Sequence, residues 1–148
     1  CRVLVGYAGV TPDAFKNPGR GKELALSQYG AGADVIFHAS GSTGLGVFEA
    51  AREKGRLAIG VDSDQHDEAP ENILTSMVKR VDVAVFDTIR ETLEGRWSGG
   101  VSAFGLAEEG VTWVYDDRNK ARIPDRAKAT VDSLRAELIA GRIVAPTQ

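Results

Sequence analysis

The sequence has one cysteine, five prolines and no long apolar run. One cysteine excludes an internal disulfide, and no stretch reaches the roughly 18–20 apolar residues that span a bilayer. The formal net charge of −3 argues against a nucleic-acid-binding protein, because such proteins usually have a basic surface. With 43% hydrophobic and 26% charged residues, the composition also argues against disorder. At 148 residues, the chain is expected to form a single domain over residues 1–148.

Short apolar runs alternate with helical periodicities along the chain, and glycines separate many of them. We expect strands at 3–8, 34–38, 57–61 and 73–78, helices at 21–29, 47–54, 81–93 and 124–140, and a β-hairpin from 101–106 and 111–115. Strands that alternate with helices form βαβ units. The sequence therefore predicts an α/β fold with a doubly wound parallel sheet in three layers, as in flavodoxin.

In such sheets, ligands bind at the carboxyl ends of the strands. This rule selects three loops, at residues 9–20, 39–46 and 62–72. The second of them is rich in glycine, follows a strand and opens a helix, so its backbone N–H groups can bind an anion or a hydroxyl-rich ligand.

The glycine-rich turn only partly matches a dinucleotide-binding motif. Gly41, Gly44 and Gly46 have the spacing G-x-x-G-x-G instead of G-x-G-x-x-G, although Asp62 follows Gly41 by 21 residues. The Tyr-x-x-x-Lys pair of short-chain reductases is absent. Three interpretations stay open: a dinucleotide site, a structural turn, and a contact with another small ligand.

The acidic loop that starts at Asp62 does not fit a calcium loop, because Asp67 and Ile73 occupy positions that require glycine and glutamate. The carboxylate of Asp62 could instead accept hydrogen bonds from vicinal hydroxyls. Lys79 ends a strand near the same edge, or is an exposed lysine at a helix start. His38 lies within a strand and is expected to be packed and hydrogen-bonded. No catalytic set is recognisable, so the sequence predicts no enzyme and no cofactor.

Several motifs occur together in one order. They are KELAL at 22–26, GADVIF at 32–37, GLGVFEAA at 44–51, IGVDSDQ at 59–65 and LTSMVKRVD at 74–82. This succession resembles the basic membrane lipoprotein family, the nucleoside-binding substrate-binding proteins of ABC importers. The resemblance extends from about residue 17 to residue 119.

The resemblance implies one lobe of a type I periplasmic-binding-protein fold, in which two lobes close on a purine nucleoside. It implies that Asp62 takes the ribose hydroxyls and that Lys79 assists there. The remaining ligand contacts are expected from Ser40, Gly41, Ser42, Thr43 and Phe15.

Family members carry an N-terminal lobe, so this chain is expected to be the C-terminal lobe, with weak or no binding alone. A helix within residues 80–96 would pack on the other lobe, or on a second copy in a homodimer with or without exchanged segments. The full-length relative would be periplasmic or membrane-anchored and would bind an ABC permease. Cys1 could be a lipidated cysteine or an ordinary strand residue. The alternatives are a structural lobe that dimerises without ligand and a nucleotide-cofactor-binding domain.

Overall fold

A computed structural model describes residues 2–146 of the chain, so Cys1 and its lipidation lie outside the described residues. The elements are η1 Pro12–Phe15, α1 Pro18–Gly30, β1 Val35–Phe37, η2 Gly41–Thr43, α2 Gly44–Lys54, β2 Leu57–Asp62, η3 His66–Glu68, β3 Ile73–Lys79, α3 Val81–Leu93, β4 Val111–Trp113 and α4 Asp125–Ile139. The structure divides into two compact units, Cys1–Met77 and Val78–Gln148. The single domain over residues 1–148 stays a prediction.

The sheet of the first unit is parallel, as its alternation of strands and helices predicts. β1 pairs with β2 in the register that joins Val35 to Leu57. Ala58 N–H donates to the backbone oxygen of Asn72 over 2.8 Å, and further along the pair a Cβ on Gly60 would lie 2.5 Å from Ser76 Oγ. β2 and β3 therefore run in the same direction, and β1 is the edge strand. The predicted α/β class is confirmed.

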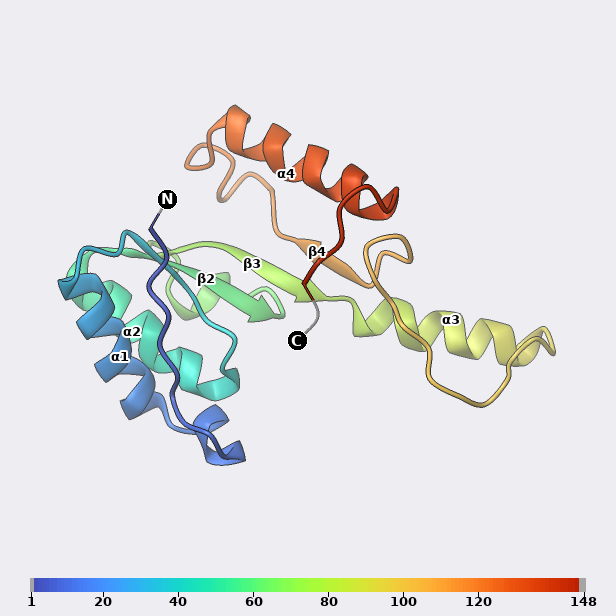
Figure 1. The fold of residues 1–148 in the computed structure, drawn as a ribbon, viewed down its shortest axis with the longest axis horizontal. Helices are drawn as coiled ribbons and strands as arrows, with labels where there is room; N and C mark the ends of the chain where they lie inside the picture. Colours follow the sequence, from blue (N-terminus) through green and yellow to red (C-terminus); the bar gives the residue numbers. More distant parts are fainter. Residues whose placement is uncertain (1, 147–148) are drawn as a thin grey trace. The chain divides into compact units, whose positions relative to one another are not determined.

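Helices α1 and α2 pack against one another, and their backbones approach closely at Gly46 (Figure 1). A Cβ on Gly46 would lie 1.8 Å from the backbone oxygen of Pro18, so only glycine fits there. α1 begins where the side chain of Asn17 accepts a hydrogen bond from Arg20 N–H over 3.0 Å. α2 ends at Gly55, whose φ of 57° is left-handed.

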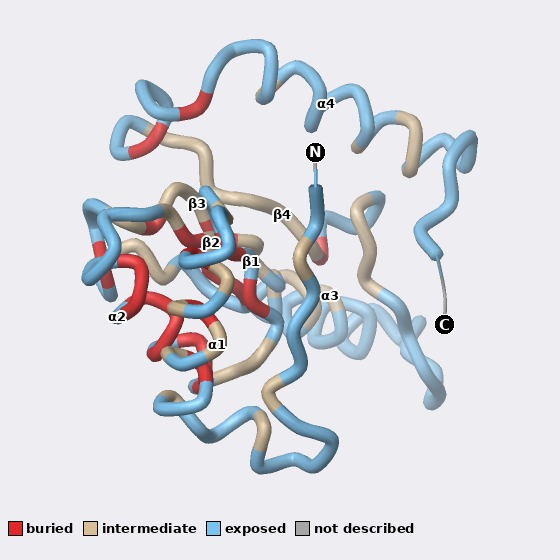
Figure 2. Tube along the Cα trace, turned by 60° about the vertical axis from the view of Figure 1, so that its left-hand side comes forward, coloured by how far each residue is buried: buried red, intermediate tan, exposed pale blue. Residues whose placement is uncertain are grey.

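The core of the first unit lies among α1, α2 and the sheet, where Figure 2 shows the buried segments. Its buried residues are Ala25, Tyr29, Ile36, Val47, Phe48, Ala50, Ala51, Ala58, Ala69 and Ile73. The helical face predicted from Val47, Ala50 and Ala51 is thus confirmed as the buried face of α2.

The predicted strand at residues 3–8 is wrong. The chain is extended there, but within the described residues it belongs to no strand. Side chains hold it instead: Gln28 Nε2 donates to the backbone oxygen of Leu4 over 3.3 Å, and the Arg2 guanidinium donates to that of Ala31 over 2.9 Å. These side chains join the segment to α1 and to the loop after it. Among the described residues, no strand therefore pairs with the outer edge of β1.

The second unit carries α3, β4 and α4. Neither helix has a buried residue, and the buried side chains of the described part of this unit are Asn119 and Ile123. Asn119 closes a loop, because its Nδ2 donates to the backbone oxygen of Val114 over 2.8 Å and its Oδ1 accepts from Asp116 N–H over 2.9 Å. Within the described residues, none of the helices has the length and apolar character that crossing a membrane requires.

The predicted hairpin is also wrong, although its second strand exists as β4. Residues 101–106 form no strand, because the chain folds back on itself before β4. Gly110 N–H donates to the backbone oxygen of Gly105 over 2.8 Å, and the Glu108 carboxylate accepts from Gly105 N–H over 2.9 Å. The left-handed residue of this turn is Glu109, with φ 56°, and not the neighbouring glycine.

Candidate functional site

The turn between β1 and α2 contacts the loop that precedes α1. Ser42 Oγ donates to the backbone oxygen of Phe15 over 2.9 Å. Gly41 has φ 55°, and a Cβ there would lie 3.1 Å from the same oxygen. The structure therefore brings Phe15 together with the predicted turn residues, and the Phe15 side chain is 53% exposed beside them.

Thr43 is buried and serves the fold. Its hydroxyl donates to the backbone oxygen of Ala14 over 2.7 Å and accepts from Asn17 N–H over 2.8 Å. These two bonds fix the loop 12–17 against the start of α2. Ser42 is exposed and Ser40 and Gly41 are partly exposed, so these three residues present the turn's accessible polar atoms.

Asp62 ends β2 and is exposed. Its φ of 71° is uncommon for a residue other than glycine, although aspartate adopts it more readily than most. Because β1 and β2 are parallel neighbours, the loops that follow them lie at the same edge of the sheet. The structure therefore places Asp62 at the edge where the turn of Ser40 and Gly41 lies.

Lys79 is the last residue of β3 and is exposed, as a side chain at the end of a strand should be. It belongs to the unit Val78–Gln148, whereas the other predicted ligand residues belong to the unit Cys1–Met77. The joint action of Lys79 and Asp62 on one ligand stays a prediction.

His38 follows β1 directly, and its imidazole is buried with 5% exposure. The predicted packing is confirmed, since its ring lies edge-on to Phe48 at 5.1 Å. The predicted hydrogen bonding is confirmed for Nδ1, which lies 3.4 Å from Ser40 Oγ. Burial lowers the pKa of His38, while Gln65 and the carboxylate of Asp62 act in the opposite direction.

A histidine at the end of a strand, directly before a glycine-rich turn, is the signal that could have marked His38 for the site. Sequence reasoning expected it to be packed and hydrogen-bonded and gave it no part in the site. The structure places it next to the turn, with Nδ1 3.4 Å from Ser40 Oγ.

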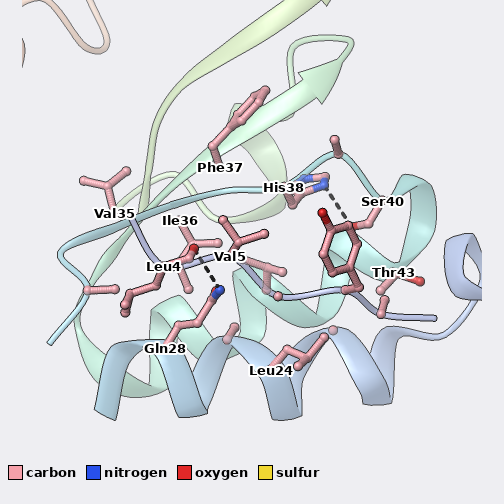
Figure 3. Close-up of a pocket in the computed structure, with 18 of the residues that line it drawn as sticks. Leu4, Val5, Leu24, Gln28, Val35, Ile36, Phe37, His38, Ser40 and Thr43 are labelled. Carbon is pink, nitrogen blue, oxygen red and sulfur yellow. Dashed lines mark hydrogen bonds between the residues drawn. The ribbon is translucent and has the colours of Figure 1, made fainter. Parts of the chain in front are cut away.

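A cavity of about 860 Å³ opens beside this region. It lies between the segment 2–9, α1 and β1, and its wall is largely aliphatic, as Leu24, Val35 and Ile36 show in Figure 3. Ser40, Thr43 and Phe15 reach its wall, whereas Gly41, Ser42, Asp62 and Lys79 do not line it. The cavity therefore adjoins the candidate site, and the charged residues Asp62 and Lys79 lie outside its wall.

The chemistry of this edge suits recognition of a ligand rich in hydroxyls. It offers a carboxylate, hydroxyls and backbone groups, which hydrogen-bond without forming covalent bonds. Among residues 2–146, no group of three His, Cys, Asp or Glu side chains is placed to hold a metal ion.

Comparisons with known proteins agree with this description. The family described as "ABC transporter substrate-binding protein PnrA-like" matches residues 2–148. Basic membrane protein D of Borreliella burgdorferi (strain JD1) is 39% identical over 124 residues, which cover 81% of this chain and 35% of that protein. An uncharacterized lipoprotein of Pyrococcus abyssi (strain GE5 / Orsay) is 41% identical over 122 residues, which cover 78% of this chain and 29% of that protein.

Among solved structures, a solute-binding protein of an ABC transporter system from Aeropyrum pernix K1 superposes with a TM-score of 0.79 at 26% identity. The match covers 94% of this chain and 48% of that one. The chain thus spans less than half the length of each of these relatives. The parallel sheet and the family match lead to one conclusion: the chain belongs to the PnrA-like family of ABC-transporter substrate-binding proteins, a family of solute-binding proteins and not of enzymes.

Proposed function

We propose that the chain is a lobe that binds a purine nucleoside for import. The observation that supports this most is the position of Asp62, an exposed carboxylate with a left-handed backbone at the end of β2, beside the turn of Ser40 and Gly41. Non-glycine residues in such backbone conformations cluster at ligand sites. The family match supports the solute-binding role of this edge.

In this proposal, the two ribose hydroxyls donate to the two oxygens of the Asp62 carboxylate, and the Lys79 ammonium donates to a ribose oxygen. Bonds to a charged acceptor contribute more than bonds between neutral groups. Ser40, Gly41 and Ser42 supply further polar contacts, and the exposed ring of Phe15 stacks on the base.

The proposal extends to a longer protein that would contain this lobe and a second one. The relatives are more than twice as long as the segment matched here, so a second lobe would form the other wall of the ligand site. The loaded protein would then deliver its nucleoside to an ABC permease on the outer side of the cytoplasmic membrane. The lipoprotein name of the Pyrococcus abyssi relative supports that location.

Calorimetric titration with adenosine, guanosine and inosine tests the proposal. We expect heat from at least one nucleoside, and about tenfold or more weaker binding after Asp62→Asn, because a charged acceptor is replaced by a neutral amide. Asp67→Asn is the matched control, since Asp67 is an exposed carboxylate of the same loop. Absence of heat with every nucleoside would refute binding by this chain, and equal affinity of wild type and Asp62→Asn would refute the role of Asp62.

The exposed face of α3 supports a second element of the proposal, a protein partner for this lobe. This face carries Val81, Val85, Phe86, Ile89 and Leu93, all at least half exposed. A contiguous apolar stripe of this kind marks an interaction surface. We propose that the second lobe, or a second copy of the chain in a homodimer, covers it. Light scattering of the 148-residue chain decides the second case: a dimer mass supports the homodimer, and a monomer at high concentration contradicts it.

A further inference from the structure

Asp62 is the middle residue of a γ-turn, a turn of three residues closed by one backbone hydrogen bond. Ser63 N–H donates to the backbone oxygen of Val61 over 2.9 Å, and the φ of Asp62 is 71°. The γ-turn with positive φ at its middle residue is the rare and strained form. A strained residue keeps its conformation only where neighbouring groups hold it there. The backbone of Asp62 therefore needs supports from outside the turn.

The side chain of Gln65 supplies one such support. Val61 lies beyond Ile59, the last residue of β2 in register with β1, and its N–H donates to Gln65 Oε1 over 2.8 Å. The side-chain oxygen thus takes the place of a partner strand at the residue that opens the γ-turn. Because Gln65 reaches back from four positions along the chain, this bond closes the loop 61–65 on itself.

Gln65 is in turn fixed to the sheet. Its backbone N–H donates over 3.1 Å to the hydroxyl of Ser76, which lies on β3 and is fully buried. Glycine at position 60 makes the room for this arrangement, since a Cβ there would lie 2.5 Å from Ser76 Oγ and 3.0 Å from Gln65 Oε1. The support of the γ-turn is therefore built on two strands of the sheet, and a larger residue than Gly60 would displace it.

We propose that Gln65 is a positioning residue of the solute site, whose side-chain oxygen keeps Asp62 in the left-handed conformation from which its carboxylate binds the ligand. This proposal rests on the proposed function, in which Asp62 accepts hydrogen bonds from the ribose hydroxyls. Gln65 needs no contact with the ligand, because it acts through the backbone of Val61 and Asp62.

The direction of the Asp62 carboxylate depends on the conformation that Gln65 holds. Without the acceptor for Val61 N–H, φ of Asp62 returns to the negative values that L residues prefer. Rotation about the N–Cα bond then carries Cβ, and the carboxylate with it, away from its present direction. Molecules in the relaxed conformation do not bind, so the apparent affinity falls with the fraction that keeps the binding conformation.

Gln65→Met tests this role, because it removes the acceptor at nearly unchanged side-chain volume. Calorimetry with adenosine, guanosine and inosine, at a temperature where circular dichroism shows the variant folded, should give about two- to tenfold weaker binding, since one hydrogen bond shifts the equilibrium that far. Gln28→Met is the matched control, because the Gln28 side chain donates to the backbone oxygen of Leu4 and not to the loop of Asp62. Equal affinity of Gln65→Met and wild type, or an equal loss in Gln28→Met, would overturn the proposal.

A second measurement needs no ligand. A residue with positive φ gives an unusually strong NOE between its own amide and Cα protons, because these two protons lie close together. Asp62 should show this NOE in the wild type and in Gln65→Glu, which keeps a side-chain oxygen as acceptor, and the NOE should weaken in Gln65→Met. An NOE of full strength in Gln65→Met, or an equal weakening in Gln65→Glu, would contradict the positioning role.

The two measurements also separate this proposal from the proposed function. If no nucleoside gives heat with the wild type, the proposed function fails, and the NOE of Asp62 still decides whether Gln65 holds its conformation. If nucleosides bind and the NOE does not respond to Gln65→Met, the positioning role fails while the proposed function stands.

Discussion

The hydroxyl of Thr43 offers the sharpest test of how the site's loops are held. It donates to the backbone oxygen of Ala14 over 2.7 Å and accepts from Asn17 N–H over 2.8 Å, across 29 and 26 residues of chain. Thr43→Val keeps the shape of the side chain and removes both bonds. Since a protein hydrogen bond contributes a net 0.5–1.5 kcal/mol, the free energy of unfolding should fall by about 2 kcal/mol.

Urea denaturation followed by far-UV circular dichroism measures this loss. Ser42→Ala is the control, because Ser42 is exposed and makes one such bond, to the backbone oxygen of Phe15 over 2.9 Å. Its cost should stay at or below about 1 kcal/mol. If Thr43→Val costs less than about 0.5 kcal/mol, or no more than Ser42→Ala, the hydroxyl does not hold the loop as described.

The same substitution has a local readout. Lys16 is exposed in the loop that Thr43 holds, so trypsin can cut there when the loop opens. A loss of about 2 kcal/mol in loop stability corresponds to cleavage after Lys16 roughly thirtyfold faster. An unchanged cleavage rate together with reduced global stability would mean that Thr43 supports α2 and not the loop.

Two further predictions concern packing and pH. Gly46→Ala should cost at least about 3 kcal/mol in urea denaturation, since its Cβ would lie 1.8 Å from a backbone oxygen of α1; Gly30→Ala, with open space around it, should be neutral or slightly stabilising, and equal effects would contradict the contact. Burial raises the pKa of Tyr29 to about 12, and its hydroxyl donates to Leu57 O over 2.8 Å. Between about pH 10 and pH 12 the unfolded chain ionises first, so stability should fall there as pH rises, and Tyr29→Phe should lack this component; parallel pH profiles would refute it.

Elements with strong local signals could be predicted from the sequence. The helix predicted at 47–54 exists as α2 with its buried face as expected, and it ends at Gly55, whose left-handed φ only a few residues adopt readily. The strands at 34–38 and 57–61 were found as β1 and β2 within a residue or two. Each of these apolar runs begins within two residues of a glycine, Gly32 or Gly55, which is a signal contained within a few positions.

Elements that depend on distant partners could not be predicted. The run at residues 3–8 has the composition of a strand, but a strand also needs a ladder, and here Gln28 and Arg2 make the bonds that hold the segment. The strand predicted at 101–106 is wrong for the opposite reason. The Glu108 carboxylate accepts from Gly105 N–H and closes a local turn, which takes the place of strand pairing. Neither side-chain bond is visible in a hydrophobic pattern.

For the candidate site, strand order was enough to select the loops, because the carboxyl ends of parallel neighbours share one edge. The sequence could not separate the roles within a loop. Thr43 and Ser42 are adjacent hydroxyls, but one is buried between two backbone groups and the other is exposed. The position of the loop 12–17, which makes both hydrogen bonds with the Thr43 hydroxyl, decides that Thr43 is buried and that Ser42 remains accessible.

The uncovered edge of β1 has a consequence for how the chain behaves in concentrated solution. Val35 and Phe37 of this strand are 38% and 55% exposed, and among the described residues no strand pairs with its outer edge. Such an edge can pair with the same edge of another molecule, which is the first step of β-aggregation. Lysine in place of Val35 would oppose that pairing by charge. The short length of β1, at three residues, already limits how much ladder any such contact could form.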